Sequence, residues 1–495
     1  MTGSQAGKGP AVELRLTVII PGAVSLGAYE AGVLTGLLGL VRAASGRIVV
    51  DTIVGASAGS VTGALLAHAL LSGANDRDLE ELWIEQTSIE NMLSARPAPG
   101  RPRSPLATTK LERWARSRLT GDDVRSEAEP IALVISIANL RGLRYRIVQR
   151  GSSRTVPADT FRDARAFMVG PRTDWSAVAQ AAVASAANAF AFAPLQITRP
   201  RGEYPTRIEI DRDPVTFWFT DGGTVYNVPL GFALDAVYDP TDLGLPIRRF
   251  PERRAFVLVS PHPTAPPDRW PATGDPTFRM ASSRALSLTT QQSLFDDLRR
   301  AEKTNSRIDG RFQLQSRLEN LLPGDEAFAA AVDEVARSAW AQKRQTQTLL
   351  GDAASAGTLE EELRRRGMPD TPSGKLDFVL DEVTETRGKE AAAFELVSPD
   401  PADGPIGSQL AGEKLVHFFG FFLADARRSD FGLGYRNLRS WWASFAPDSS
   451  VEVPQHHLER FPVRGDLSMR DVPALHRWWL AARLGVRYAR ELLRG

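Results

Sequence analysis

A serine stands at the centre of residues 55–59, GASAG, which have the form GxSxG. The preceding residues 48–54 are mostly β-branched and apolar, as in a strand buried on both faces. Small apolar residues at helical spacing follow. A serine on a tight strand-to-helix turn is typical of a nucleophile elbow, with Gly55 and Gly59 allowing the turn. A chance match in a Gly-, Ala- and Ser-rich chain is the alternative, but this context favours Ser57 as a nucleophile.

An aspartate at the end of another expected strand offers a base. Residues 215–220, VTFWFT, indicate a strand, and Asp221 follows it, with Gly222 and Gly223 next. Open α/β sheets keep their active sites at the carboxyl ends of the strands. Asp221 alone would be interpreted as a turn or capping residue. Together with Ser57, it is interpreted as the group that takes the serine proton.

A small-residue loop at 22–27 separates an expected strand at 13–20 from an expected helix at 28–41. The loop fits neither the P-loop nor the GxGxxG nucleotide pattern. Its other use is as an oxyanion hole, in which a well-placed N–H donor stabilises a tetrahedral intermediate by roughly 3 to 4 kcal/mol. The candidate donors are the backbone N–H groups of Gly22, Ala23, Val24 and Ser25.

The composition sets the class of the protein. The chain has 495 residues, of which 43% are hydrophobic and 24% charged, as in a globular protein with more than one core. With 60 Lys and Arg against 59 Asp and Glu, no overall field favours nucleic acid as a partner. Cysteine is absent, which excludes disulfides, thiolate metal sites and a cysteine nucleophile. We expect neither a metal nor a cofactor.

The expected location is the cytoplasm. The first twelve residues lack the apolar segment of a signal peptide, and no apolar run looks long enough to span a bilayer. Export that needs no such signal is the alternative. The sequence makes no prediction about the oligomeric state.

Strands and helices alternate over the first half of the chain, which predicts a three-layer α/β sandwich with a mostly parallel central sheet. We expect a flexible segment at 1–12, a catalytic α/β domain at 13–262, and a largely helical C-terminal region at 263–495 packed on that domain. The expected strands are 13–20, 48–54, 131–138, 143–148 (joined to 131–138 by a turn at 139–142), 215–220, 254–260, 376–383 and 394–398. The expected helices are 28–41, 76–93, 111–119, 173–187, several within 280–367, 415–424, 436–445 and 472–493.

Four motifs resemble, in their order, those of the patatin-like phospholipases. They are GAVSLGAYEAGVL at 22–34, GxSxG at 55–59, an Ala- and Ser-rich segment at 184–194 that ends in Phe and Pro, and the segment from Asp221 through Asn227 to Pro229. GxSxG alone is a weak signal, whereas the ordered set is specific. It covers roughly the first half of the chain. A weaker resemblance links 398–442 to the carboxyl part of larger bacterial patatin-related proteins.

The resemblance implies a lipid acyl hydrolase in which Ser57 and Asp221 form a catalytic dyad. The sequence departs from the family at one point. The family usually has three glycines and then a basic residue, whereas this chain has Gly22, Ala23, Val24 and then Leu26. Alanine and valine keep their N–H donors in place if φ stays negative. The missing basic side chain removes a group that could contact an anionic headgroup.

Histidines offer competing interpretations. His262 follows a strand, and the order Ser, Asp, His is that of α/β-hydrolases, but a loop histidine between prolines is the favoured interpretation. His456 and His457 are adjacent and would point to opposite faces of a strand, which is unfavourable for a metal site. His68, on the helix after Ser57, is interpreted as a packed or surface residue.

The last expected helix carries a basic stripe that could lie on an anionic bilayer. Core packing with a solvated basic face is the favoured interpretation of this helix. The stripe consists of Arg483, Arg487, Arg490 and Arg494.

Together these patterns predict a serine lipid acyl hydrolase, a phospholipase A or lipase-like esterase that works through an acyl-enzyme. Its expected partners are a lipid or phospholipid substrate and, peripherally, a membrane. The alternatives are a non-catalytic relative that binds lipid or protein, and a Ser-Asp-His esterase.

Overall fold

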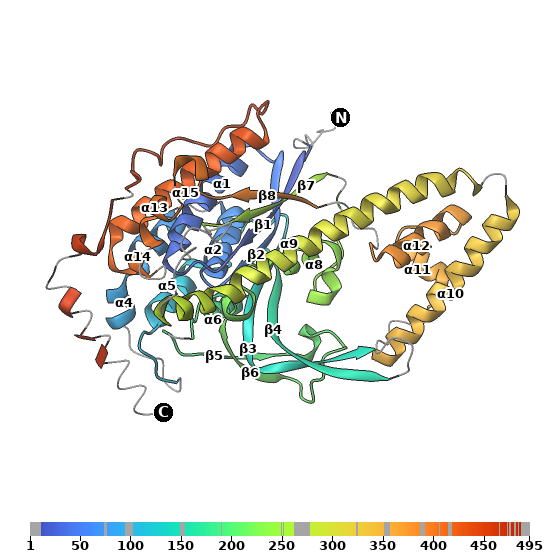
Figure 1. Ribbon diagram of the computed structural model, residues 1–495, viewed down its shortest axis with the longest axis horizontal. Coiled ribbons are helices and arrows are strands. Elements are labelled where there is room, and N and C mark those ends of the chain that lie inside the picture. Colours follow the sequence, from blue (N-terminus) through green and yellow to red (C-terminus); the bar gives the residue numbers. More distant parts are fainter. Residues whose placement is uncertain are drawn as a thin grey trace, which may run out of the picture.

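The computed structural model of the chain (Figure 1) has an α/β body, a long helical arm and a C-terminal segment that packs back on the body. It describes residues 11–73, 77–94, 102–148, 154–189, 191–248, 250, 252–261, 278–322, 325–350, 357–386, 392–404, 406–413, 418–464, 466–472, 474, 477–479, 482–483 and 485–486.

An eight-stranded sheet forms the centre of the body, in the order β5-β6-β3-β2-β1-β7-β8, with β4 paired to β3 outside this path. The neighbours from β3 to β8 run parallel, and the pairs that involve β4, β5 and β6 are antiparallel. The predicted mostly parallel sheet is confirmed. The strands are β1 (Leu14–Ile20), β2 (Ile48–Ala56), β3 (Ile131–Val148), β4 (Thr155–Val169), β5 (Leu195–Arg199), β6 (Val215–Asp221), β7 (Arg253–Val259) and β8 (Ala393–Val397).

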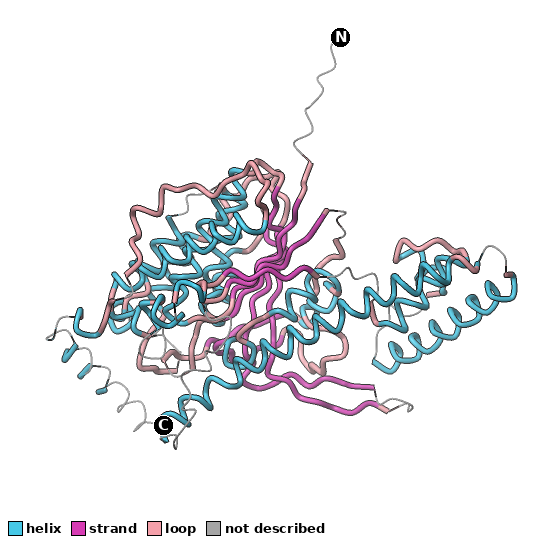
Figure 2. The backbone as a smooth tube through the Cα atoms, turned by 45° about the horizontal axis from the view of Figure 1, so that its top comes forward, coloured by secondary structure: helices cyan, strands magenta, loops and turns pink. Residues whose placement is uncertain are grey.

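Helices cover both faces of the sheet, as Figure 2 shows with the strands between two helical layers. Val18 and Ile20 of β1 face one layer and Ile19 faces the other, so the strand is buried along its whole length. This is the expected three-layer α/β architecture. The helices of the body are α1 (Gly27–Ala43), α2 (Ala58–Ser72), α3 (Arg77–Glu81), α4 (Ile89–Ser94), α5 (Thr109–Arg118), α6 (Trp175–Ser185), α7 (Gly223–Tyr226) and α8 (Leu230–Tyr238).

Strand β3 differs from the prediction. Residues 131–138 and 143–148 belong to one long strand rather than to two legs of a hairpin. At 139–142 the pairing with β4 shifts register, Gly142 takes a φ of 83°, and the Asn139 side chain accepts hydrogen bonds from the next backbone N–H groups. The turn-forming residues thus build an irregularity that bends the strand without ending it.

Helix α1 and the short 3₁₀ helix before it are mostly apolar, with Glu30 and Thr35 as buried polar residues. Together they span Val24–Ala43, which is long and apolar enough by length and composition to cross a bilayer, with a mean hydropathy of 1.5. The expectation that no apolar run reaches this length is therefore wrong. In the structure, 83% of that apolar window is buried. The segment is mostly apolar because it lies inside the core, between the sheet and later helices.

The helical arm extends from the body in Figure 1. Its first helix contacts the body where Asp297 accepts a hydrogen bond from the Tyr226 hydroxyl. The two shorter helices of the arm pack between the two long ones. The helices are α9 (Phe278–Glu319), α10 (Glu326–Leu350), α11 (Leu359–Arg365) and α12 (Pro372–Thr384).

The strand expected at 376–383 is wrong, because these residues belong to α12. The Thr371 side chain caps the helix and Pro372 occupies its first turn, which are start signals of a helix. The alternating apolar residues fit because α12 is buried on two sides. Leu376 packs in one cluster and Phe378 in another. A two-sided helix produces the alternation that usually indicates a strand.

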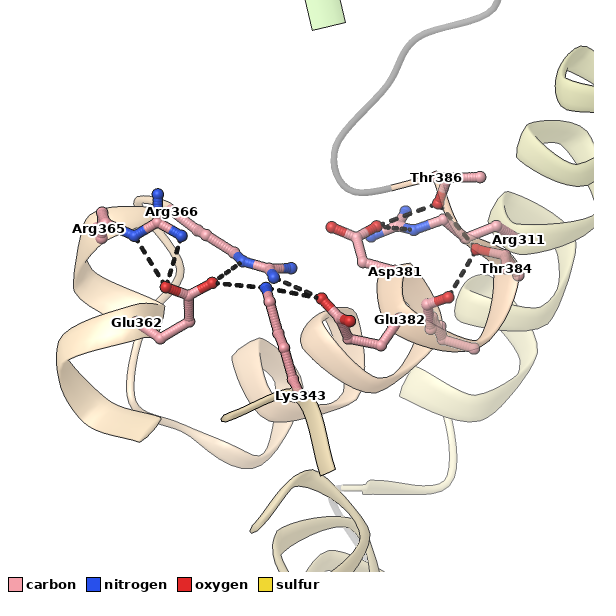
Figure 3. Close-up of polar contacts among 10 residues, drawn as sticks. Arg311, Lys343, Glu362, Arg365, Arg366, Asp381, Glu382, Thr384 and Thr386 are labelled. Atoms are coloured by element: carbon pink, nitrogen blue, oxygen red, sulfur yellow. Dashed lines mark hydrogen bonds and ion pairs between the residues drawn. The ribbon is translucent and has the colours of Figure 1, made fainter. Parts of the chain in front are cut away.

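Buried ion pairs hold the arm together (Figure 3). The Glu362 carboxylate accepts hydrogen bonds from Lys343 of α10 at 3.0 Å and from Arg366 at 2.8 Å. Nearby, Arg311 of α9 donates to Asp381 of α12 at 2.7 Å. Lys343 also donates to Glu382 of α12 at 3.3 Å, so that these contacts together join all four helices of the arm. The charges are mutually compensated in a partly dry environment.

The C-terminal segment returns to the body. Strand β8 pairs with β7 and ends the sheet, in the place expected for 394–398. The helix expected at 436–445 starts earlier, as α15 (Ala424–Phe445), and lies along α1. The helix expected at 415–424 is the short α14 (Phe419–Phe422), after α13 (Ile406–Gln409). Most of 472–493 lies outside the described residues. The domain division at 262/263 stays a prediction.

Candidate active site

Ser57 lies on the turn between β2 and α2, with a φ of 50° and a ψ of −125°. A positive φ is strained for a residue with a Cβ, and such residues gather at functional sites. The two flanking glycines explain the motif. A Cβ on Gly55 would meet the Gly59 carbonyl oxygen at 2.5 Å, and a Cβ on Gly59 would meet the Ile20 carbonyl oxygen at 2.3 Å. The turn can be this tight only because both positions lack a side chain.

Asp221 ends β6 and faces the serine. The Ser57 hydroxyl donates a hydrogen bond to Asp221 Oδ2 at 2.9 Å, and the Gly223 N–H donates to Asp221 Oδ1 at 2.8 Å. Both residues are buried: Ser57 is 7% exposed and Asp221 is 4% exposed. Gly222 has no space for a side chain, since a Cβ there would meet the Ser136 carbonyl oxygen at 2.1 Å. The structure therefore brings the predicted pair into contact.

Burial changes the acid strength of the aspartate. Removal from water raises the pKa of Asp221 from 3.8 to about 6, while hydrogen bonds from Gly223, Ser57 and Asn188 act in the opposite direction. At neutral pH the group is still a carboxylate. It is a stronger base than an ordinary aspartate, which suits proton transfer from a serine.

The loop at 22–25 lies against the serine. Gly22 donates its N–H to the Asn227 carbonyl at 3.1 Å and accepts from Asn227 Nδ2 at 2.9 Å. A Cβ on Gly22 would come within 2.8 Å of Ser57 Cβ. The loop is therefore fixed beside the nucleophile by Asn227, a residue of the fourth sequence motif.

Val24 contradicts the condition set for this loop. Ala23 has a φ of −131°, but Val24 has a φ of 53°. A β-branched residue in the left-handed region is an outlier, and the strain is of order 1 to 3 kcal/mol. The condition that φ stays negative at the substituted positions is therefore met at Ala23 and not at Val24. The position has the conformation that a glycine adopts freely.

Ser185 is a further residue of the site that the sequence analysis gave no role. Its Oγ accepts hydrogen bonds from the Ser57 N–H and from the Ser60 hydroxyl, both at 2.8 Å, and donates to the Ser136 carbonyl at 2.5 Å. It is fully buried. Ser185 thereby fixes the backbone of the nucleophile turn to β3. Its place in the Ala- and Ser-rich motif was the only signal in the sequence.

The other candidate residues lie elsewhere. His262 is outside the described residues. His68 contacts the Thr120 carbonyl at 2.9 Å and the Trp175 ring, as a packed residue of α2. The rings of His456 and His457 lie 4.0 Å apart in a turn, so the expectation that they point apart on a strand is wrong. Within the described part of the chain, no group of three or more His, Cys, Asp or Glu residues could hold a metal ion.

The chain is similar to known proteins over part of its length. Residues 18–234 match the family model described as patatin-like phospholipase. The chain is also similar to a protein of Mycobacterium tuberculosis (strain ATCC 25618 / H37Rv) named "Uncharacterized membrane protein Rv3479", with 25% identity over 315 residues. The match covers 55% of this chain and 27% of the relative, so the chain spans about a quarter of that protein's length.

Proposed function

We propose that the chain is a serine lipid acyl hydrolase that cleaves carboxylic ester bonds of lipids, since residues 18–234 match the family model of the patatin-like phospholipases. The observation that carries the proposal is the 2.9 Å hydrogen bond from the Ser57 hydroxyl to the buried Asp221 carboxylate. Ser57 lies on a strained strand-to-helix turn of the kind that exposes a nucleophile.

In the proposed reaction, Ser57 Oγ attacks the ester carbonyl carbon while Asp221 takes the hydroxyl proton. N–H groups of loop residues 23–25 stabilise the oxyanion, whereas the Gly22 N–H already donates to the Asn227 backbone carbonyl. The tetrahedral intermediate collapses, the bond to the alcohol breaks, and Asp221 returns the proton to the leaving oxygen. A water then attacks the carbonyl carbon of the acyl-serine while Asp221 takes one of its protons. The bond between this carbon and Ser57 Oγ breaks, Asp221 returns the proton to Ser57 Oγ, and the fatty acid is released.

Covalent labelling tests this proposal. A fluorophosphonate probe should label the native chain, and Ser57→Ala should abolish labelling and lower the turnover of a short-chain ester by several orders of magnitude. Ser72→Ala, in the last turn of the same helix, is the matched control and should keep both activities. Unchanged hydrolysis by a folded Ser57→Ala variant would refute the assignment.

Two alternatives have their own tests. The altered loop, with Ala23 and Val24 in place of glycines, is the feature that motivates a non-catalytic lipid- or protein-binding relative. Failure of the native, folded chain to react with the probe in the presence of lipid vesicles would select this alternative. A Ser-Asp-His esterase would lose its activity in His262→Gln, whereas a Ser-Asp enzyme would keep it.

We also propose a cytoplasmic enzyme that meets its lipid substrate at a membrane surface. The burial of α1 supports this, because its apolar length is used within the core. Recovery of the full-length chain in the membrane fraction after an alkaline carbonate wash would instead favour a membrane-embedded protein, as in the printed name of the relative.

A further inference from the structure

The loop at 22–25 is held in a conformation that its sequence disfavours. Val24 is half-buried, has a φ of 53°, and lies two residues after the glycine that touches Ser57. A β-branched residue keeps such a backbone only when its surroundings over-determine it. The question is which contacts supply that constraint.

One constraint comes from the body of the domain. Asn227 holds Gly22 by two hydrogen bonds, at 3.1 and 2.9 Å. These contacts fix the loop before Val24. The Leu26 N–H donates to the Ala23 carbonyl at 2.9 Å, which closes the turn across residues 24–25 from within the loop. A second constraint acts on the far side of Val24.

The C-terminal segment supplies that second constraint. The Gly420 N–H of α14 donates to the Ser25 hydroxyl at 3.2 Å. The approach is close, since a Cβ on Gly420 would lie 2.6 Å from Ser25 Oγ, and a Cβ on Gly412 would lie 3.3 Å from the same atom. Ser25 itself is fully buried. Ser25 thus lies between Gly412 and Gly420 of the C-terminal segment.

Arg427 of α15 connects Gly420 to the α/β body. It is 3% exposed, and its guanidinium donates to the Gly420 carbonyl at 2.5 Å and to the Ile84 carbonyl at 2.7 and 3.2 Å. Burial lowers the pKa of Arg427 to about 10, so the group is charged at neutral pH and its hydrogen bonds are charge-assisted. Removal of the side chain would leave two buried carbonyls without this donor.

We propose that Gly420 and Arg427 are positioning residues that hold Val24 in its left-handed conformation and thereby keep the loop at 22–25 aligned with Ser57. Both lie outside the segment that matches the family model. A glycine at position 24 would adopt a positive φ without help. With valine at this position, contacts from the C-terminal region maintain the positive φ. The inference rests on the proposed hydrolase function for its catalytic readout.

Rescue by glycine is the decisive experiment. In the full-length chain, Arg427→Ala and Ser25→Ala should each lower kcat for a short-chain ester, and the rate of fluorophosphonate labelling, by about tenfold or more with little change in KM. Adding Val24→Gly should restore kcat of either variant to within about threefold of the Val24→Gly single variant. Glycine adopts a positive φ without the clamp, by which we mean the contacts of Ser25 with Gly420 and of Gly420 with Arg427. A merely structural lesion would not be repaired in this way.

Arg311→Ala is the matched control, since it removes another buried arginine, in the arm and away from the loop. It should keep kcat, and Val24→Gly should have the same effect in it as in the native chain. Equal losses in Arg427→Ala and Arg311→Ala, or no rescue by Val24→Gly in an active protein, would overturn the proposal. If Arg427→Ala does not fold, Ser25→Ala carries the same test.

A stability measurement tests the contacts that hold Val24 independently of the proposed hydrolase function. If the native chain is not labelled at all, the proposed hydrolase function fails. The clamp is then tested by urea unfolding, in which Val24→Gly should raise the midpoint more in the native background than in Ser25→Ala, since strain exists only where the clamp imposes it. Equal shifts in both backgrounds would refute the clamp independently of activity.

Discussion

At the scale of single residues, Asp221 opposes folding at neutral pH. Its folded pKa of about 6 lies above the ordinary 3.8, so the folded chain holds the proton more tightly, and the free energy of unfolding falls as the pH rises from about 4 to 6. Above pH 6 this one group makes the free energy of unfolding roughly 3 kcal/mol lower than it is below pH 4. Asp221→Asn should therefore raise the melting temperature at pH 8, and this gain should shrink below pH 5. A pH-independent difference would contradict the raised pKa.

At the scale of elements, α1 and α15 pack at backbone contact. A Cβ on Gly434 would meet the Tyr29 carbonyl oxygen at 2.0 Å, and one on Gly32 would meet the Phe431 carbonyl oxygen at 1.9 Å. Because neither backbone atom can give way locally, Gly434→Ala should lower stability by about 1 to 3 kcal/mol in urea unfolding. Gly310→Ala in α9 meets no atom within 4 Å and should be neutral or stabilising. Equal effects of the two substitutions would reject the close packing.

The same scale shows what sequence can predict here. The turn around Ser57 is encoded locally, so strand, serine and glycines indicate it together. Helix α12 was missed because its two buried sides imitate a strand. The roles of Ser185 and Asn227 depend on partners more than a hundred residues away, which no local pattern reveals. The φ of Val24 is set by such tertiary contacts rather than by the residue itself.

At the scale of the whole molecule, residues up to 261 pack against elements that come from much later in the chain. The described residues place β8 on β7 and α15 on α1, both from beyond residue 390. A chain cut after Pro261 should therefore be insoluble or aggregated, since it exposes a parallel strand edge and the apolar face of α1. Expression of both lengths, followed by size-exclusion chromatography and thermal melting, checks this. A soluble, cooperatively melting short chain would show that the later residues are dispensable for folding.

The order of the sheet also bears on how the protein is made. Strand β8 is synthesised roughly 130 residues after β7. At 5 to 20 residues per second, the ribosome needs on the order of ten seconds for that stretch. During this interval the nascent domain presents β7 as an unpaired edge, and the arm is the segment being translated. The protein thus passes through a vulnerable stage in every round of translation, in which a chaperone that covers apolar strand edges would raise the yield.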